Sequence, residues 1–410
     1  MTPSASENGK TLYRWLILAA SVMAMLFAGI IYAWSILKVP FEQDFGMLPE
    51  QLSLNFTLTM CFFCVGGLVG SFLSRKIGVK LANFISAVLA GSGMALTGLL
   101  DSENINMLYL TYAVITGLGI GIAYNVIIST VSAWFPDKKG LCTGCLMMGF
   151  GASSLILGNL ASLAFDSSLA FRGTYILLGI ALFVVLAIVS LILRLPNADV
   201  VFLQVNKKVN NQPKEFEQKD YTTKEMLKRF SFWRAFVFLV FITAVGNAVI
   251  SFARDLALSV GANVSLATTL VGVLAVCNGL GRILTGALFD NLGRKKTMFI
   301  ATILAIVASG ITLISVVIGS LALCIVGLCL TGLSYGSCPT MNGAIVSAFY
   351  GQKHFATNFS IITCNLIFAS FIATACSYLL DAFGGYTAPF ILLLALAVAS
   401  FVLNLTIRRP

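Results

Sequence analysis

The sequence predicts an all-α membrane protein with twelve transmembrane helices in two six-helix halves. Its 410 residues are 58% hydrophobic and only 10% charged, and the mean hydropathy is +0.95. A soluble protein of ordinary composition carries about a quarter charged residues. Apolar segments of about 20 residues recur along the whole chain, which is the length that a helix needs to cross a bilayer. The shorter alternating segments of a membrane β-barrel are absent from the sequence.

The first apolar segment follows a short polar N-terminus and is expected to be the first membrane helix. It is too long for a signal peptide and has no obvious cleavage site of small residues. The helices predicted for the first half span residues 14–38, 52–73, 81–100, 105–131, 140–164 and 171–194. Those predicted for the second half span 232–253, 264–289, 297–318, 320–348, 354–379 and 387–407. The one long polar stretch divides the chain into a bundle over 1–194, a linker over 195–231 and a bundle over 232–410.

Basic residues gather in the loops on one predicted side of the membrane. Twelve helices place both termini on that side, together with 22 of the 26 Lys and Arg residues. The four others are Lys38, Arg172, Arg254 and Arg282. By the positive-inside rule, the basic side is cytoplasmic and the protein is a multi-pass protein of the cell membrane. Orientation explains the net charge of +10 better than a nucleic-acid partner does.

The two halves repeat one another at a nearly constant offset. Three pairs of positions lie 211 or 215 residues apart: Tyr124 with Tyr335, Tyr175 with Tyr386, and Gly78 with Gly293. Three pairs at nearly one offset indicate a duplicated six-helix unit. Parallel repeats of this kind suit a transporter that rocks about a central site.

One loop and two helical segments resemble a known family. GALFDNLGRKK (286–296) resembles the loop signature G-x-L-x-D-x-x-G-R-K-K of the major facilitator superfamily. WFPDKKGLCTGCLMMGFGASS (134–154) looks like the start of helix 5 in the oxalate/formate antiporter family and in the related monocarboxylate transporters. GIIYAWSILKVPFEQDFG (29–46) resembles helix 1 of the same proteins. The resemblance covers essentially the whole chain and implies secondary transport of small carboxylates.

The signature loop is expected to act in the conformational change. A glycine permits close helix approach, a carboxylate caps or pairs at a helix end, a second glycine turns the chain, and basic residues hold the cytosolic face. These residues are Gly286, Asp290, Gly293, Arg294 and Lys295. The copy in the first half is degenerate, because Ser71 replaces the glycine and Arg75 the aspartate.

Arg282 is the candidate for substrate binding. It is the only charge in the apolar segment 264–289, and it lies about 12 Å along the helix axis from Asp290, near the membrane midplane. A central arginine costs roughly 2.5–3.5 kcal/mol on insertion scales, so packing does not explain it. The sequence places no acid deep in another helix to pair with it. The predicted counter-ion is therefore a carboxylate substrate, which the guanidinium fork binds through two hydrogen bonds.

Two asparagines bear on the charge of the site. Asn278, one turn before Arg282, is predicted to orient the guanidinium or bind the substrate. Many eukaryotic monocarboxylate transporters have an aspartate at the matching position, which is linked with proton coupling, and asparagine does not titrate. At the position that matches Asn365, the oxalate-specific member of the family has a lysine. With one arginine and no lysine, the site is expected to bind a monoanion better than a dianion. Asn365 itself can equally form a hydrogen bond between two helices.

Polar side chains on three other helices complete the predicted site. The resemblance places helices 1, 4 and 10 around the cavity, and these helices carry Tyr32, Tyr124, Asn125 and Tyr335. The tyrosine hydroxyls can donate to a carboxylate while the rings exclude water. The alternative for a tyrosine in a membrane protein is a place at the lipid interface.

The remaining charged residues near helix ends, the histidine and the cysteines are not assigned to the substrate site. Lys38 and Arg254 either attract anions to the outer mouth or anchor helix ends at the interface. The only histidine, His354, is expected at the cytosolic surface. The ten cysteines lie mostly in apolar segments, and helix packing explains them better than a metal or redox site.

The function expected from the sequence is secondary transport of small monocarboxylates such as lactate, pyruvate, formate or acetate. The alternatives are an oxalate/formate-like exchanger and, in a different class, a non-transporting sensor or scaffold. No Walker motif supports an ATP-driven pump, and no catalytic or metal constellation supports an enzyme. The expected partners are a carboxylate, a proton in the symport alternative, and the lipid bilayer. No cofactor, metal or nucleic acid is expected, the protein is expected to be a monomer, and exchange is favoured over proton symport.

Overall fold

The computed structural model describes residues 5–135, 139–196, 220–351 and 353–409, without the side chains of 5–12, 139–141 and 290. Within these ranges, twelve helical spans are long and apolar enough to cross a membrane, and no strand occurs. The predicted all-α membrane fold is therefore confirmed. The linker residues 197–219 lie outside the described ranges, so the division at 195–231 stays a prediction.

The helical spans follow one another along the chain with short connections. The first span comprises α1 (Ala5–Ala28), the 3-10 turn η1 (Gly29–Ala33), α2 (Trp34–Leu37) and α3 (Val39–Gln43). It is followed by α4 (Pro49–Ile77) and α5 (Val79–Thr97), and then by a span made of η2 (Ile105–Met107), η3 (Tyr109–Thr116) and α6 (Gly117–Trp134). The first half ends with α7 (Lys139–Phe165) and α8 (Ala170–Ile192). The short α9 (Thr223–Leu227) precedes the second half. There the elements are α10 (Phe230–Ser259), α11 (Val264–Ile318), α12 (Leu321–Tyr350), α13 and α14 (Phe355–Thr363, Asn365–Phe383) and α15 (Thr387–Thr406).

Several of the described spans change their backbone geometry inside the bundle, among them the first, the tenth and the eleventh. The first span passes through the 3-10 turn Gly29–Ala33, and the eleventh breaks at Cys364, directly before Asn365. In α12, Pro339 has no N–H to donate to the carbonyl of Tyr335, four residues earlier. Irregular backbone in a membrane helix is tolerated where it lines a cavity or is covered by protein, and it is typical of transporter binding sites.

The two glycines at the predicted repeat loops adopt the same backbone conformation. Gly78, between α4 and α5, has φ 86° and ψ 160°, and Gly293, inside α11, has φ 72° and ψ 173°. A side chain disfavours this region, so glycine is the residue that permits the turn. Gly293 divides the long α11 into two limbs that cross the membrane separately, Val264–Phe289 and Asn291–Ile318. The matching conformations support an internal duplication.

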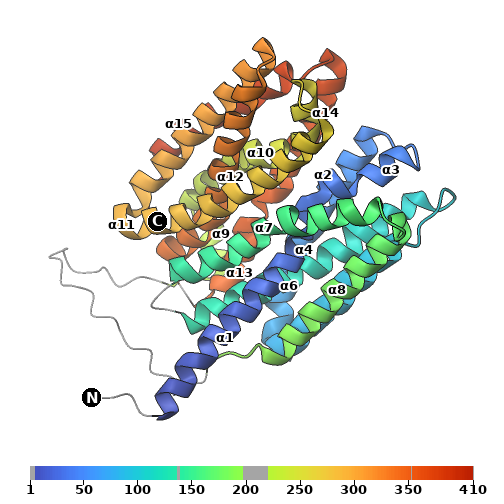
Figure 1. Ribbon diagram of the computed structural model, residues 1–410. Coiled ribbons are helices and arrows are strands. Elements are labelled where there is room, and N and C mark those ends of the chain that lie inside the picture. The colour runs from blue at the N-terminus through green and yellow to red at the C-terminus, as the bar shows by residue number, and fades with distance from the viewer. Residues whose placement is uncertain (1–4, 136–138, 197–219, 352, 410) are drawn as a thin grey trace.

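The two halves form bundles that lie side by side (Figure 1). Helix α7 of the first half packs along α11 of the second, and α4 packs along α13 and α14. Helix α1 begins and α15 ends on the same side of the molecule. We call this the terminal side, which also carries the turns at Gly78 and Gly293, and we call the other the opposite side.

The halves contact each other on both sides of the molecular centre. On the terminal side, Asn125 Nδ2 donates to Ser360 Oγ at 2.7 Å, and Arg75 donates to Thr357. On the opposite side, the hydroxyls of Thr57 and Thr374 lie 2.7 Å apart. These contacts therefore hold the halves together on both sides of the centre.

Candidate functional site

Arg282 lies in the first limb of α11 and is fully buried, with 0% of its surface exposed. Its Nε donates to Asn278 Oδ1 at 3.1 Å, and its Nη1 donates to the backbone carbonyl of Met147 in α7. Its Nη2 is buried and has no hydrogen-bond partner among the described residues. Of all buried side chains that the structure describes, only Arg282 is charged, and no described carboxylate forms an ion pair with it.

Close packing of α12 fixes where the arginine stands. A Cβ atom on Gly336 would come within 2.9 Å of the Arg282 backbone nitrogen, so only glycine allows α12 to approach α11 at this height. The preceding residue, Tyr335, packs its ring against Gly246 of α10. Small residues of this kind let membrane helices come close. The sequence thereby brings the arginine and a tyrosine of two different helices to one place.

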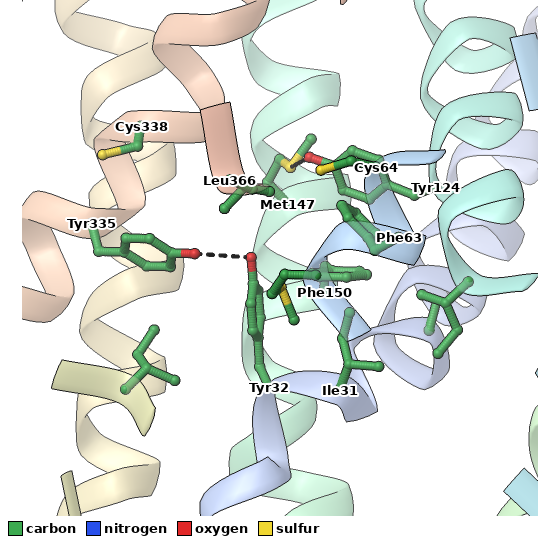
Figure 2. Close-up of a cluster of buried hydrophobic side chains, with 14 of the residues drawn as sticks. Ile31, Tyr32, Phe63, Cys64, Tyr124, Met147, Phe150, Tyr335, Cys338 and Leu366 are labelled. Atoms are coloured by element: carbon green, nitrogen blue, oxygen red, sulfur yellow. Dashed lines mark hydrogen bonds between the residues drawn. The ribbon is translucent and has the colours of Figure 1, made fainter. Parts of the chain in front are cut away.

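Three tyrosines, each from a different helix, line the same cavity as Arg282. Figure 2 shows these tyrosines, Tyr32, Tyr124 and Tyr335, within a buried cluster of side chains. The hydroxyls of Tyr32 in η1 and Tyr335 in α12 lie 3.1 Å apart and join the two halves. Tyr124 of α6 donates to Met147 Sδ at 3.3 Å, and its ring lies 5.2 Å from that of Phe150. Met147 therefore contacts both Tyr124, through its sulfur, and Arg282, through its carbonyl.

These side chains enclose a small cavity at the centre of the molecule. The cavity measures about 10 Å³, which is room for about one water molecule. Five of the seven predicted substrate-binding residues line it: Tyr32, Tyr124, Arg282, Tyr335 and Asn365. The space is too small for a carboxylate of the lactate or formate type, so the halves have to separate before such a molecule enters.

The cavity also has a polar wall, of which sequence analysis predicted Asn365 and missed the other members. Asn365 Nδ2 donates to Asn342 Oδ1 at 3.0 Å and to the carbonyl of Ile362, and both asparagines line the cavity. Thr243 of α10 lines it as well. The repeat offers a signal for Thr243, because it lies 211 residues after Tyr32, the same offset that relates Tyr124 to Tyr335.

Asn342 could have been found from its spacing. It lies seven residues after Tyr335, hence two turns along the same face of the helix. Thr363, the other missed polar residue of this wall, is the last residue of α13 before the break at Cys364. A threonine at that position has no distinctive pattern in the sequence.

Two predicted site residues lie outside the arginine cavity. Asn278 lines a neighbouring small cavity and holds Arg282 through its Oδ1. Asn125 lines a third cavity and bonds Ser360 of the other half. Asn278 is therefore placed to orient the guanidinium, whereas Asn125 forms part of the contact between the halves on the terminal side.

The signature loop is described only in part. Gly286 is buried in the first limb of α11, and Gly293 makes the turn. The guanidinium of Arg294 lies 4.7 Å above the ring of Phe349 in α12, and Lys295 is exposed. The side chain of Asp290 lies outside the description, so its pairing stays a prediction.

An ion pair on the opposite side joins the halves. Lys38 Nζ lies 3.0 Å from Asp255 Oδ2 at the end of α10, and Arg254 lies 3.8 Å from the same carboxylate. Sequence analysis treated Lys38 and Arg254 as anion attractors or interface anchors and did not foresee a pair. The distance of 217 residues between Lys38 and Asp255 leaves no local signal for it.

Comparison with known proteins identifies the family. The chain is 27% identical to an uncharacterized MFS-type transporter, YhjX, of Escherichia coli (strain K12), over 88% of this chain and 86% of that protein. It is 26% identical to the oxalate:formate antiporter of Oxalobacter formigenes (83% and 80%) and 24% identical to human monocarboxylate transporter 12 (86% and 71%). The crystal structure of the transporter FucP in the outward conformation shares the fold, with a TM-score of 0.67 at 13% identity, over 97% of this chain and 100% of that chain. The sequence profile of the Major Facilitator Superfamily matches residues 16–253 and 236–410, and the protein is therefore a multi-pass membrane transporter that belongs to this superfamily.

Proposed function

We propose that this transporter carries small monocarboxylates of the lactate, pyruvate, formate or acetate type by alternating access, with Arg282 binding the carboxylate. The observation that carries the proposal is a fully buried arginine without a described acid partner and with a buried, unbonded Nη2. An uncompensated charge in a membrane helix is costly and therefore marks a functional site. A carboxylate supplies both the missing negative charge and the missing acceptor.

The other cavity residues have roles that follow from their chemistry. The hydroxyls of Tyr32 and Tyr335 form a hydrogen bond with each other in this structure. Once the halves separate, each hydroxyl can donate to a carboxylate instead. Asn278 holds the guanidinium in position, because its Oδ1 accepts a hydrogen bond from Arg282 Nε. The rings of Tyr124 and Phe150 provide an apolar surface for the short carbon chain of the substrate.

The neutral amides favour a monoanion over a dianion. Asn365 and Asn342 are hydrogen-bonded to each other and carry no charge, so the described cavity offers one cation. A second carboxylate would be buried there without a positive partner, which is costly. The second candidate function is exchange of a dicarboxylate for a monocarboxylate, because one relative is an oxalate:formate antiporter that matches 83% of this chain.

The transport cycle that we propose is a rocking of two bundles, 1–194 and 232–410, around the central site. The signature loop takes part in this conformational change on the terminal side. Its residues are Gly286, Asp290, Gly293, Arg294 and Lys295. We place both termini and the linker 195–231 in the cytoplasm, because the basic residues gather on that side. The protein works as a monomer in this scheme, since the site lies within one chain.

Binding to the purified protein tests the proposal directly. Thermal unfolding is followed with formate, acetate, lactate, pyruvate and oxalate added separately, because a ligand of the folded state raises the unfolding temperature. We expect a rise with at least one monocarboxylate and its loss in Arg282→Ala. Uptake of that compound into proteoliposomes then separates a transporter from a sensor or scaffold, which binds and moves nothing. Absence of any carboxylate effect on binding and uptake contradicts the proposal.

A further inference from the structure

A second cavity, much larger than the central one, opens on the terminal side. It measures about 650 Å³ and lies between the start of the second limb of α11 and the end of α15. Four basic residues line it: Arg294, Lys295, Lys296 and Arg408. No Asp or Glu is among the lining residues whose side chains are described, so the described wall concentrates positive charge.

The positive charges of this cavity are available for a ligand. None of the four basic side chains forms an ion pair with an acid of the described residues. The lysines are exposed, and Arg294 is half-buried with its guanidinium over the ring of Phe349. A cation held on an aromatic face keeps its hydrogen-bond donors at the edge of the guanidinium plane, where a phosphate can accept from them.

The remaining wall of the cavity is apolar and faces outward. Leu292, Phe299, Ile300 and Leu405 line it, and they are 41% to 65% exposed. The cavity lies where the spans Asn291–Ile318 and Thr387–Thr406 end on the terminal side. The ends of membrane-spanning helices are expected to reach the headgroup region of a bilayer. A soluble anion would leave this apolar wall in contact with water, whereas acyl chains would cover it.

We propose that this cavity binds the phosphate headgroup of an anionic lipid, whose acyl chains lie along α11 and α15. Basic pockets between membrane helices are suited to such headgroups, because each Lys or Arg near the surface attracts anionic lipid. The basic residues supply the charge, and the exposed apolar residues supply the surface for the chains. The site is separate from the carboxylate cavity, since the two share no lining residue.

The equivalent loop of the first half is engaged differently. Arg75 donates to the carbonyl of Ser71 and to Thr357 of the other half, and Lys76 lies 5.8 Å above the ring of Phe72. Lys76 and Lys80 thus provide basic residues on the same side of the membrane that do not line the cavity. They serve as a matched control for charge removal.

The experiment measures lipid binding to the full-length protein purified in a neutral detergent. Phosphatidylglycerol, phosphatidylcholine or inorganic phosphate is titrated, and thermal unfolding and native mass spectrometry follow binding. Phosphatidylglycerol is expected to raise the unfolding temperature and to stay bound in the gas phase. The Lys295→Gln/Lys296→Gln variant is expected to weaken this binding on the order of thirtyfold. Arg408→Gln, which changes the α15 wall, is expected to weaken it about fivefold.

Three results would overturn the proposal. The first is equal stabilisation by phosphatidylcholine, which carries no net charge. The second is full competition by inorganic phosphate at equal concentration, which would identify a site for a soluble anion. The third is an equal loss of binding in Lys76→Gln/Lys80→Gln, which would mean diffuse attraction by surface charge. Unfolding in phosphatidylcholine alone shows whether each variant is folded.

Discussion

The hydroxyls of Tyr32 and Tyr335 meet 3.1 Å apart, and this hydrogen bond joins the two halves of the protein beside Arg282. Their rings cross edge to face at 74° with centroids 6.1 Å apart. The adjoining cavity measures only about 10 Å³, which is too small for a carboxylate. In the transport cycle proposed above, the two tyrosines therefore separate before a carboxylate reaches Arg282.

Removal of one hydroxyl from this pair should weaken substrate binding. In Tyr335→Phe the ring still fills its place, but the donor for a carboxylate is gone. We expect an affinity roughly 10- to 100-fold lower, since a hydrogen bond to a charged group contributes roughly 1.5–3 kcal/mol. Titration calorimetry with the preferred monocarboxylate measures the change. Tyr112→Phe is the control, because the Tyr112 hydroxyl is buried, unbonded among the described residues and outside the cavity; an equal loss there would contradict a local role.

Substitution of Arg282 should separate substrate binding from stability. Arg282→Lys keeps a charge but loses the fork, and Arg282→Met removes both, so each should bind the carboxylate on the order of a hundredfold more weakly. The Met variant should unfold at an equal or higher temperature than the parent without ligand, because it no longer buries an unpaired charge. Thermal unfolding with and without carboxylate gives both quantities. A Met variant that binds normally places the site elsewhere.

The sequence predicts the helices well because hydrophobicity alone specifies a membrane span. It makes Arg282 a candidate for a related reason, since a single charge is conspicuous in an apolar segment. Thr243 and Asn342 were missed although the repeat offset and the helical spacing point to them, because threonine and asparagine also serve in ordinary helix contacts. The folded structure brings both to one cavity. The pair between Lys38 and Asp255 depends on how the halves pack, which no local pattern encodes.

A positive charge at position 365 should change the charge selectivity. Asn365 lines the same cavity as Arg282, so Asn365→Lys adds a second cation for a second carboxylate. We expect oxalate to compete poorly in the parent and at least tenfold better in the variant, while formate loses relative affinity. Competition against labelled monocarboxylate in proteoliposomes measures the ratio. Asn365→Gln controls for size, and tight oxalate binding by the parent would support the dicarboxylate exchanger instead.

Loss of the Lys38 pair should favour opening of the opposite side. The side chains of Lys38 and Asp255 are 12% and 36% exposed, so the pair contributes at most about 1 kcal/mol. Asp255→Asn should therefore raise the open population by up to about fivefold. Alkylation of a cysteine introduced at Ser53, which contacts Ser377 across the halves on that side, measures opening.

The exchanged pair Lys38→Asp/Asp255→Lys is the decisive comparison for this contact. It restores opposite charges across the halves and should return alkylation to the parent rate. Arg254→Gln is the control, because Arg254 lies on the same helix as Asp255, and the ion pair described for it is within that half. If the exchanged pair stays as reactive as Asp255→Asn, the ion pair does not hold this side closed.

A carboxylate at position 278 should convert exchange into proton-coupled transport. Asn278 accepts a hydrogen bond from Arg282 Nε at 3.1 Å, and no buried acid is described near the site. The empty site therefore keeps an unneutralised charge, which opposes its reorientation, whereas a bound monoanion neutralises it. The parent should show counterflow, with labelled uptake that depends on unlabelled substrate inside the liposomes.

In Asn278→Asp the carboxylate can pair with Arg282 when the site is empty and take up a proton when substrate binds. This variant should accumulate substrate in empty liposomes under an inward proton gradient, several-fold above the parent. Asn278→Ser removes the hydrogen bond without adding a titratable group and should gain no such uptake. Strong gradient-driven uptake by the parent itself would replace exchange with symport, with the proton carried by the substrate or by a tyrosine or water chain. Uptake by the parent, Asn278→Asp and Asn278→Ser is therefore compared with and without a proton gradient. The comparison shows whether transport is exchange or symport and whether a charge at position 278 couples it to protons.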